Sequence, residues 1–288
     1  MSQALPHRQL AGFYFFYFAY VGAFAPFFSL YLDDAGLSPL EIGVVMAVPA
    51  FTRIVAPHLW GWLADASGQH MMLVRAASLA GLVCWLGIFV STAFLWICTV
   101  VFAFSFFLAA ALPVVEATTL AHLGERTGGY GGIRLWGSIG YIVAVVGAGY
   151  ALGVFPVGVL SWVVALTLAG TLAFACLVPG VKAEPHAADQ QAITHILARP
   201  EVIALIMACA LMAVAHGPYY AFYSIHVVEP GYRQGLTGWL GAVGGICEIA
   251  VFPRLSSPYS AFTPRHILLW SFALSGVRFL LIRWGAGR

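Results

Sequence analysis

The chain has 288 residues, of which 61% are hydrophobic and only 8% are charged, and its formal net charge is +2. Soluble domains carry about 25% charged residues, so this composition excludes a domain that folds in water. The small positive charge also gives no reason to expect nucleic acid as a partner. We therefore expect a protein whose solvent is the lipid bilayer.

Long apolar segments follow one another along the whole sequence. A bilayer core needs about 20 apolar residues in a helix, and continuous rather than alternating runs indicate helices instead of barrel strands. No small-residue cleavage site follows the first apolar run, so we expect that span to be retained. The fold class is thus an all-α membrane protein. About nine spans are predicted, at residues 10–32, 40–60, 71–91, 95–121, 133–152, 155–178, 201–227, 235–253 and 266–284.

The connections between these spans are short, with one exception. Residues 180–200 hold the main cluster of polar residues in the chain. We interpret this segment as a cytoplasmic linker. It divides the chain into an N-terminal six-helix bundle at residues 1–179 and a partial C-terminal bundle of three helices at residues 201–288.

The positions of the basic residues predict the orientation. Cytoplasmic ends of membrane spans are enriched in lysine and arginine. With the N-terminus inside, seven basic residues lie at cytoplasmic ends and three at outer ends. We therefore expect a multi-pass protein of the inner (plasma) membrane with a cytoplasmic N-terminus. The seven are Arg8, Arg75, Arg126, Lys182, Arg199, Arg254 and Arg265.

Five charged residues lie inside predicted spans. Each costs about 2.5–3.5 kcal/mol at the bilayer centre, so such residues indicate function and need a partner. Three arginines and two glutamates leave one positive charge in excess, which favours an anionic solute such as a carboxylate. The five are Arg53, Glu116, Arg134, Glu248 and Arg278.

Four of these charges form two candidate pairs. Glu116 and Arg134 are equally far from the turn that joins their spans, and Glu248 and Arg278 repeat this arrangement around a later turn. On antiparallel helices, equal distance from the turn gives equal depth. This permits pairing without proving it. Either pair could instead be a structural ion pair that holds helices together.

Other candidates within the spans have weaker signals. Arg53 could have a gating or proton-linked role, or it could snorkel towards the interface or bond to backbone groups that nearby prolines leave unpaired. His216 precedes the segment PYYAFY, in which Tyr219 and Tyr220 could line a cavity for an aromatic ligand. Most of the aromatic run at residues 13–20 is expected to face lipid or the membrane interface.

Signatures of enzymes and metal sites are missing from the sequence. It has no HExxH, GxSxG or Walker motif, and its five cysteines lie in apolar runs without CxxC spacing. We therefore expect neither an enzyme nor a bound metal or cofactor.

Several motifs resemble the major facilitator superfamily. The segment GWLADASGQHMML resembles its loop signature through Gly61, Asp65 and Gly68. Other residues occupy the usual basic positions of that signature, namely Ala66, Gln69 and His70.

A longer segment, residues 112–141, is similar to helices four and five of the phenylpropionate permease-like branch, which is related to lactose permease-type proton symporters. In those proteins a glutamate and an arginine at these places contact substrate, and Glu116 and Arg134 match them. Residues 215–252 resemble helices seven and eight of the same branch, with the acidic residue at Glu248. The segment GVRFLLIRWG resembles the arginine motif of helix nine, with Arg278.

The resemblance implies a helical bundle of the major facilitator type. Members have twelve helices in two six-helix bundles around a central cavity, so we expect a C-terminally truncated member that ends after the ninth helix. A partner chain would then complete the second bundle. The alternative is a truncated, non-transporting membrane protein that acts as a scaffold or regulatory fragment.

The expected function is that of a secondary active transporter of the proton symporter type. The solute is a small organic molecule, such as the aromatic carboxylate phenylpropionate, which moves by alternating access. Protons and the lipid bilayer are the other expected partners. The expected substrate-binding residues are Glu116, Arg134, Tyr219 and Tyr220, and the gating or proton-linked residues are Glu248, Arg278, His216 and Arg53.

Overall fold

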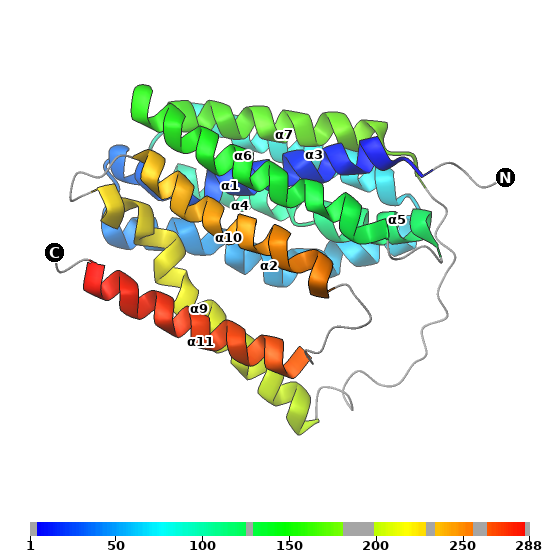
Figure 1. Cartoon of the computed structure of the whole chain (residues 1–288). Coiled ribbons are helices and arrows are strands. Elements are labelled where there is room, and N and C mark those ends of the chain that lie inside the picture. The colour runs from blue at the N-terminus through cyan, green and yellow to red at the C-terminus, as the bar shows by residue number, and fades with distance from the viewer. Residues whose placement is uncertain (1–4, 125–128, 181–198, 229–233, 256–263, 286–288) are drawn as a thin grey trace. The chain divides into compact units, whose positions relative to one another are not determined.

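The computed structural model describes residues 5–124, 129–180, 199–228, 234–255 and 264–285, and every element in these ranges is helical (Figure 1). Each predicted span coincides with a helix or with two consecutive helices. The elements are α1 (His7–Asp34), α2 (Pro39–Ser67), α3 (His70–Leu86), the 3-10 helix η1 (Gly87–Phe89), α4 (Phe94–Leu108), α5 (Ala111–Leu123), α6 (Tyr130–Val154), α7 (Val159–Leu177), α9 (Pro200–Val228), α10 (Gln234–Leu255) and α11 (Pro264–Gly285).

Within the described residues, seven helical segments are long and apolar enough to cross a membrane. One of them comprises α3 and η1, and another comprises α4 and α5. The helices α10 and α11 occupy the other two predicted positions, and α11 contains the shorter apolar stretch Leu268–Leu280. The prediction of an all-helical membrane protein is therefore confirmed, with nine as an approximate number of spans.

The fourth predicted span is interrupted between α4 and α5. Pro113 has no N–H group, so it cannot donate to the carbonyl of Ala109 one turn earlier. At the same point the N–H of Ala110 bonds to the carbonyl of Phe107 at 3.2 Å, three residues back instead of four. The carbonyl of Phe106 accepts a bond from the indole Nε1 of Trp60 on α2 at 2.9 Å. A side chain of α2 thus satisfies a backbone group at the interruption.

The second helix is longer than the predicted span and ends at a glycine. It starts with a capping box, in which the Ser38 N–H donates to the Glu41 carboxylate at 2.8 Å. It ends at Gly68, whose φ of 62° is left-handed, a conformation that glycine adopts without strain. As a result, Gly61 and Asp65 of the loop signature lie on the last turns of α2.

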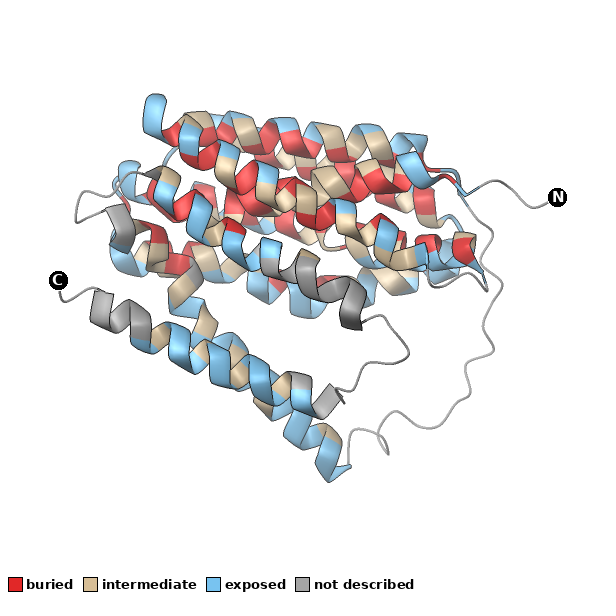
Figure 2. Ribbon diagram, viewed as in Figure 1, coloured by how far each residue is buried: buried red, intermediate tan, exposed pale blue. Residues whose placement is uncertain are grey.

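The chain divides into two compact units. The first contains residues 1–189 and 217–249, and the second contains residues 190–216 and 250–288. In the first unit, α1 packs mainly against α6 and α7, while α3 contacts α4, α5 and α7 and α2 contacts α4. Figure 2 shows the buried residues gathered on the helices of this first unit.

A buried aromatic cluster joins α1 to α3 and α4. The rings of Phe24 and Trp85 have centroids 5.9 Å apart, and Phe104 lies 5.0 Å from Trp85 and 5.4 Å from Phe24. The indole of Trp85 donates to the carbonyl of Ser161 on α7 at 3.0 Å. Edge-to-face pairs of this kind contribute about 0.5–1.5 kcal/mol beyond the area they bury.

Glycines allow α1 and α6 to approach each other at backbone distance. A Cβ atom at Gly22 would lie 2.6 Å from the carbonyl oxygen of Tyr141, and one at Gly140 would overlap the carbonyl oxygen of Phe15. Small residues of this kind allow helices in membranes to approach closely. We call these two backbone contacts the α1–α6 seam.

One arginine caps a neighbouring helix. Arg75 on α3 donates from Nη2 to the carbonyl of Val178 at 2.8 Å and from Nε to that of Ala175 at 3.2 Å. Both carbonyls lie at the C-terminal end of α7, where a cation is favoured by the helix dipole.

The first unit also includes the C-terminal part of α9 and most of α10. The hydroxyl of Ser224 donates to the carbonyl of Pro26 on α1. On α10, the indole of Trp239 donates to the hydroxyl of Tyr150 on α6 at 3.1 Å. In the second unit, the ring of His216 on α9 contacts that of Phe279 on α11 with centroids 5.5 Å apart.

Candidate functional site

Glu116 and Arg134 lie on two helices of the first unit and are both half-buried. The hydroxyl of Tyr130 donates to Oε1 of Glu116 at 3.4 Å. Tyr130 is the first residue of α6 and Arg134 follows it by four residues, so the two side chains share a face of that helix. The start of α6 therefore presents a phenol to the carboxylate and a guanidinium next to it. Both Glu116 and Arg134 lie within electrostatic range of the Tyr130 hydroxyl.

The guanidinium of Arg134 lies over an aromatic ring of α1. Its Cζ atom is 3.9 Å from the centroid of Phe18. This is a cation–π contact, in which the ring attracts the positive charge. It replaces part of the hydration that the guanidinium loses inside the membrane.

The hydroxyl groups of Tyr14 and Thr119 form a buried pair that links α5 to α1. The hydroxyl of Tyr14 lies 3.3 Å from Oγ1 of Thr119, which is one turn beyond Glu116 on α5. Tyr14 is fully buried and within reach of both Tyr130 and Glu116. We call Tyr14, Glu116, Thr119, Tyr130 and Arg134 the polar cluster.

A second arginine, Arg53, lies near the tyrosines of α1. The side chain of Arg53 on α2 is exposed, but it lies within electrostatic range of the hydroxyls of Tyr17 and Tyr20. Tyr17 is also within range of Glu116. The structure thus places Arg53 and Glu116 around one tyrosine-bearing face of α1, although the two residues are far apart in sequence.

The other predicted site residues are on α9, α10 and α11. Tyr219 packs against Tyr223 with ring centroids 4.6 Å apart. Nδ1 of His216 lies 2.9 Å from the carbonyl of Met212, a local bond within α9. Arg278 is exposed on α11.

Two predicted residues have side chains outside the described part of the structure, Tyr220 and Glu248. Their backbones belong to α9 and α10 respectively. The pairing of Glu248 with Arg278 therefore stays a prediction.

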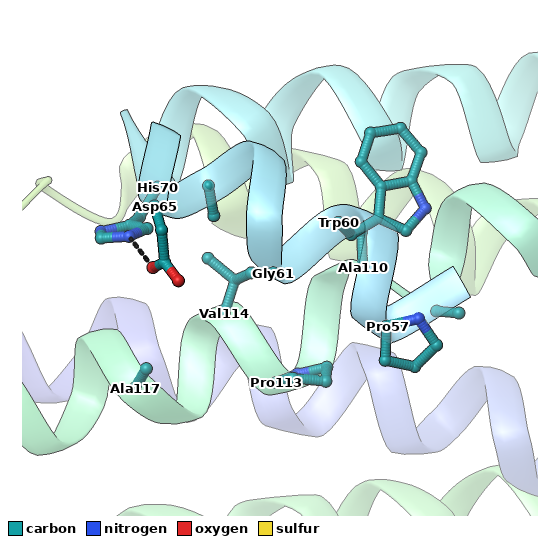
Figure 3. Close-up of a pocket in the computed structure, with 11 residues that line it drawn as sticks. Pro57, Trp60, Gly61, Asp65, His70, Ala110, Pro113, Val114 and Ala117 are labelled. Carbon is teal, nitrogen blue, oxygen red and sulfur yellow. Dashed lines mark ion pairs between the residues drawn. The ribbon is translucent and has the colours of Figure 1, made fainter. Parts of the chain in front are cut away.

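Two residues of the loop signature, Gly61 and Asp65, border an apolar pocket of about 140 Å³ between α2 and α5 (Figure 3). Oδ1 of Asp65 lies 3.6 Å from Nε2 of His70, with the Asp65 side chain largely exposed. Gly61 lines the pocket, and a Cβ atom there would meet open space. His70 thus contacts the aspartate from a position that is usually basic in the resembled signature.

The sequence-based prediction for the aromatic run on α1 was wrong in part. Phe13, Tyr14 and Tyr20 are buried in the first unit instead of facing lipid. Tyr14, Phe18 and Tyr130 were not predicted from the sequence as neighbours of Glu116 and Arg134. One available signal was the spacing of Tyr14 and Phe18, which are four residues apart and so share a helix face.

A family model described as the MFS_1 like family matches residues 7–287. The chain belongs to this family. It is therefore a multi-pass membrane protein and a transporter of small organic solutes, not an enzyme, within the major facilitator superfamily.

Two curated relatives illustrate the range of the family. The Escherichia coli (strain K12) protein named "Probable 3-phenylpropionic acid transporter" is 26% identical over 282 residues, which cover 96% of this chain and 73% of that protein. The maltose permease of Geobacillus stearothermophilus is 29% identical over 202 residues, which cover 69% of this chain and 51% of the permease.

A solved structure supports the fold. The crystal structure of a mutant of the nucleoside transporter NupG matches with a TM-score of 0.74 and 17% sequence identity, covering 88% of this chain and 69% of that chain. At this identity the similarity shows the transporter fold alone.

Proposed function

We propose that this MFS_1 like protein is a proton-coupled symporter for a small organic anion, with an aromatic carboxylate such as phenylpropionate as the preferred solute. The observation that carries the proposal is the gathering of Glu116, Arg134 and Tyr130 next to the aromatic face of α1. The printed name of the Escherichia coli relative supports the same class of solute.

Each part of the cluster suits one part of such a solute. A guanidinium presents two parallel N–H donors to a carboxylate, so Arg134 is the proposed anion ligand. Aromatic side chains such as Tyr17 offer an apolar wall for the ring of the solute. Tyr219 and Tyr220 are proposed to contact the solute from α9.

The proposed proton carrier is Glu248, and Glu116 is proposed to contact the solute next to Arg134. A carboxyl group in an apolar site gains a proton more readily than one in water, which a proton-linked step requires. Glu248 and Arg278 are proposed as a gating pair, with His216 and Arg53 as further gating or proton-linked residues. Alternating access would move the bundles at residues 1–179 and 201–288 about the site. The proposed location is the inner membrane with the N-terminus in the cytoplasm, as the basic residues favour.

The test is uptake of labelled 3-phenylpropionate into membrane vesicles that contain the chain. We expect accumulation with an imposed proton gradient and a loss of accumulation with a protonophore. Arg134→Ala should raise the half-saturation concentration by about a hundredfold, because it removes the charged partner of a desolvated carboxylate. Arg134→Lys keeps the charge but not the paired donors, so its effect should be intermediate.

The matched control is Arg8→Ala, because Arg8 is exposed at the start of α1 and is not part of the cluster. Wild-type uptake by the Arg134→Ala variant would show that this site is not where the solute binds. Uptake that does not depend on the proton gradient would reject proton symport but would not contradict the assignment of the binding site.

A further inference from the structure

The guanidinium of Arg134 contacts the ring of Phe18 and lies close to Gly137. The cation lies 3.9 Å above the centroid of Phe18 on α1. A Cβ atom at Gly137, one turn further along α6, would lie 2.7 Å from the Phe18 ring and 2.8 Å from Nη1 of Arg134. Because Gly137 has no side chain, there is room for the Phe18 ring and the Arg134 guanidinium to lie together.

The distance between the two helices is fixed independently of these side chains. On α1, the backbone contacts of the α1–α6 seam are at Phe15 and Gly22, on either side of Phe18, and they meet Gly140 and Tyr141 of α6. Phe18 itself is braced by Tyr17, whose ring contacts it edge-on with centroids 5.5 Å apart. The ring under the cation is thus part of a packed surface.

Stacking uses the face of a guanidinium and not its edge. All five N–H donors of an arginine lie in the plane of the group. A ring that lies against that plane restricts its tilt and leaves the donors at the edge of the group. Such an arrangement would hold the donors in the orientation that two oxygens of a planar anion require.

We propose that Phe18 is a positioning residue that sets the plane of Arg134, and that it thereby makes the site selective for carboxylates over neutral analogues. This inference rests on the proposed function, in which Arg134 binds the carboxylate of the solute. It adds a residue from α1 that touches the ligand-binding cation and need not touch the solute.

The experiment compares Phe18→Leu with Phe18→Tyr in the full chain. Leucine keeps apolar bulk but has no ring face, whereas tyrosine keeps the ring. Competition of labelled 3-phenylpropionate uptake by 3-phenylpropionamide measures the preference for the charged solute. We expect Phe18→Leu to raise the half-saturation concentration about tenfold, with maximal uptake unchanged and a weaker preference over the amide. Phe18→Tyr should stay within about twofold of the wild type.

A second measurement does not depend on transport. Phenylglyoxal modifies arginine, and the extent of modification at Arg134 can be read by mass spectrometry of the purified chain. A guanidinium released from its ring should react about threefold faster in Phe18→Leu than in the wild type or in Phe18→Tyr. Size-exclusion chromatography of each variant checks that it is folded.

The two measurements separate the two hypotheses. Faster modification without any phenylpropionate uptake by the wild type would support the positioning role and overturn the proposed solute. Equal modification in all three proteins would overturn the positioning role, as would an equal loss of transport in Phe18→Tyr and Phe18→Leu.

Discussion

The helices α1 and α9 have almost the same length, 28 and 29 residues, but very different surroundings. In the most apolar part of each candidate span, 56% of the α1 residues are buried and none of the described α9 residues are. The difference lies in backbone contact. Neighbouring helices approach α1 at glycines, whereas α9 carries exposed side chains such as Leu211 and Val214.

This difference affects how polar groups are held. Next to α1, charged and hydroxyl side chains contact groups on other helices, as Arg134 contacts Phe18 and Tyr14 contacts Thr119. On α9, His216 bonds to a carbonyl of its own helix and contacts the ring of Phe279, whereas Ser224 bonds to a carbonyl of α1 itself. Contacts between helices fix a side chain in space, and therefore the region around α1 is the better candidate for a solute site.

The largest expected effect comes from breaking the α1–α6 seam. Gly140→Ala places a methyl group against the carbonyl of Phe15, and overpacking of this kind costs about 1–3 kcal/mol. Gly276→Ala on α11 is the matched control, because a Cβ atom there meets open space. Thermal unfolding in detergent should show a clear loss for Gly140→Ala and none for Gly276→Ala. Equal melting temperatures would mean that the seam does not stabilise the bundle.

A smaller loss is expected when the cap on α7 is removed. Arg75→Ala leaves the carbonyls of Ala175 and Val178 without their donor, which should cost about 1–2 kcal/mol. The comparison is Arg8→Ala, which removes an equal charge from an exposed position. Guanidinium-induced unfolding in mild detergent measures both. A similar loss in the two variants would indicate a general effect of charge rather than capping.

The smallest effect is expected at the end of α2. Asp65 is largely exposed, so its contact with His70 should contribute at most about 0.5 kcal/mol. Asp65→Asn should therefore reduce the melting temperature less than Arg75→Ala does. A loss as large as that of Arg75→Ala would mean that this contact stabilises the bundle more than its exposure suggests.

The sequence predicts the helices of this protein better than it predicts their neighbours. The length of the apolar segments was sufficient to locate the helical segments, because a helix needs about 20 apolar residues to cross the bilayer core. The burial of Phe13 and Tyr14 could not be predicted in this way, because lipid tails are as apolar as a protein core and leave little contrast between the two faces of α1. Hydropathy therefore located α1 without showing which of its faces packs against protein.

The candidate site shows the same division. Equal distance from a turn predicts similar depths for Glu116 and Arg134, and both lie within electrostatic range of Tyr130. The sequence could not show that Tyr130 bonds to Glu116 or that the Phe18 ring contacts the guanidinium of Arg134, since these contacts depend on side-chain packing. Phe18 in particular comes from a distant part of the chain, and only the folded bundle brings it there.

The interruption between α4 and α5 has a consequence for the helix that carries Glu116. A carbonyl group in the bilayer core has no water to accept a hydrogen bond from. If this joint straightened, the N–H of Ala110 would therefore have to donate to the carbonyl of Phe106 in place of the Trp60 indole. One hydrogen bond would then replace another at Phe106, while Pro113 offers no N–H to the carbonyl of Ala109 in either arrangement. Such a rearrangement would change the direction of the thirteen residues of α5, and the carboxylate of Glu116 would move with them.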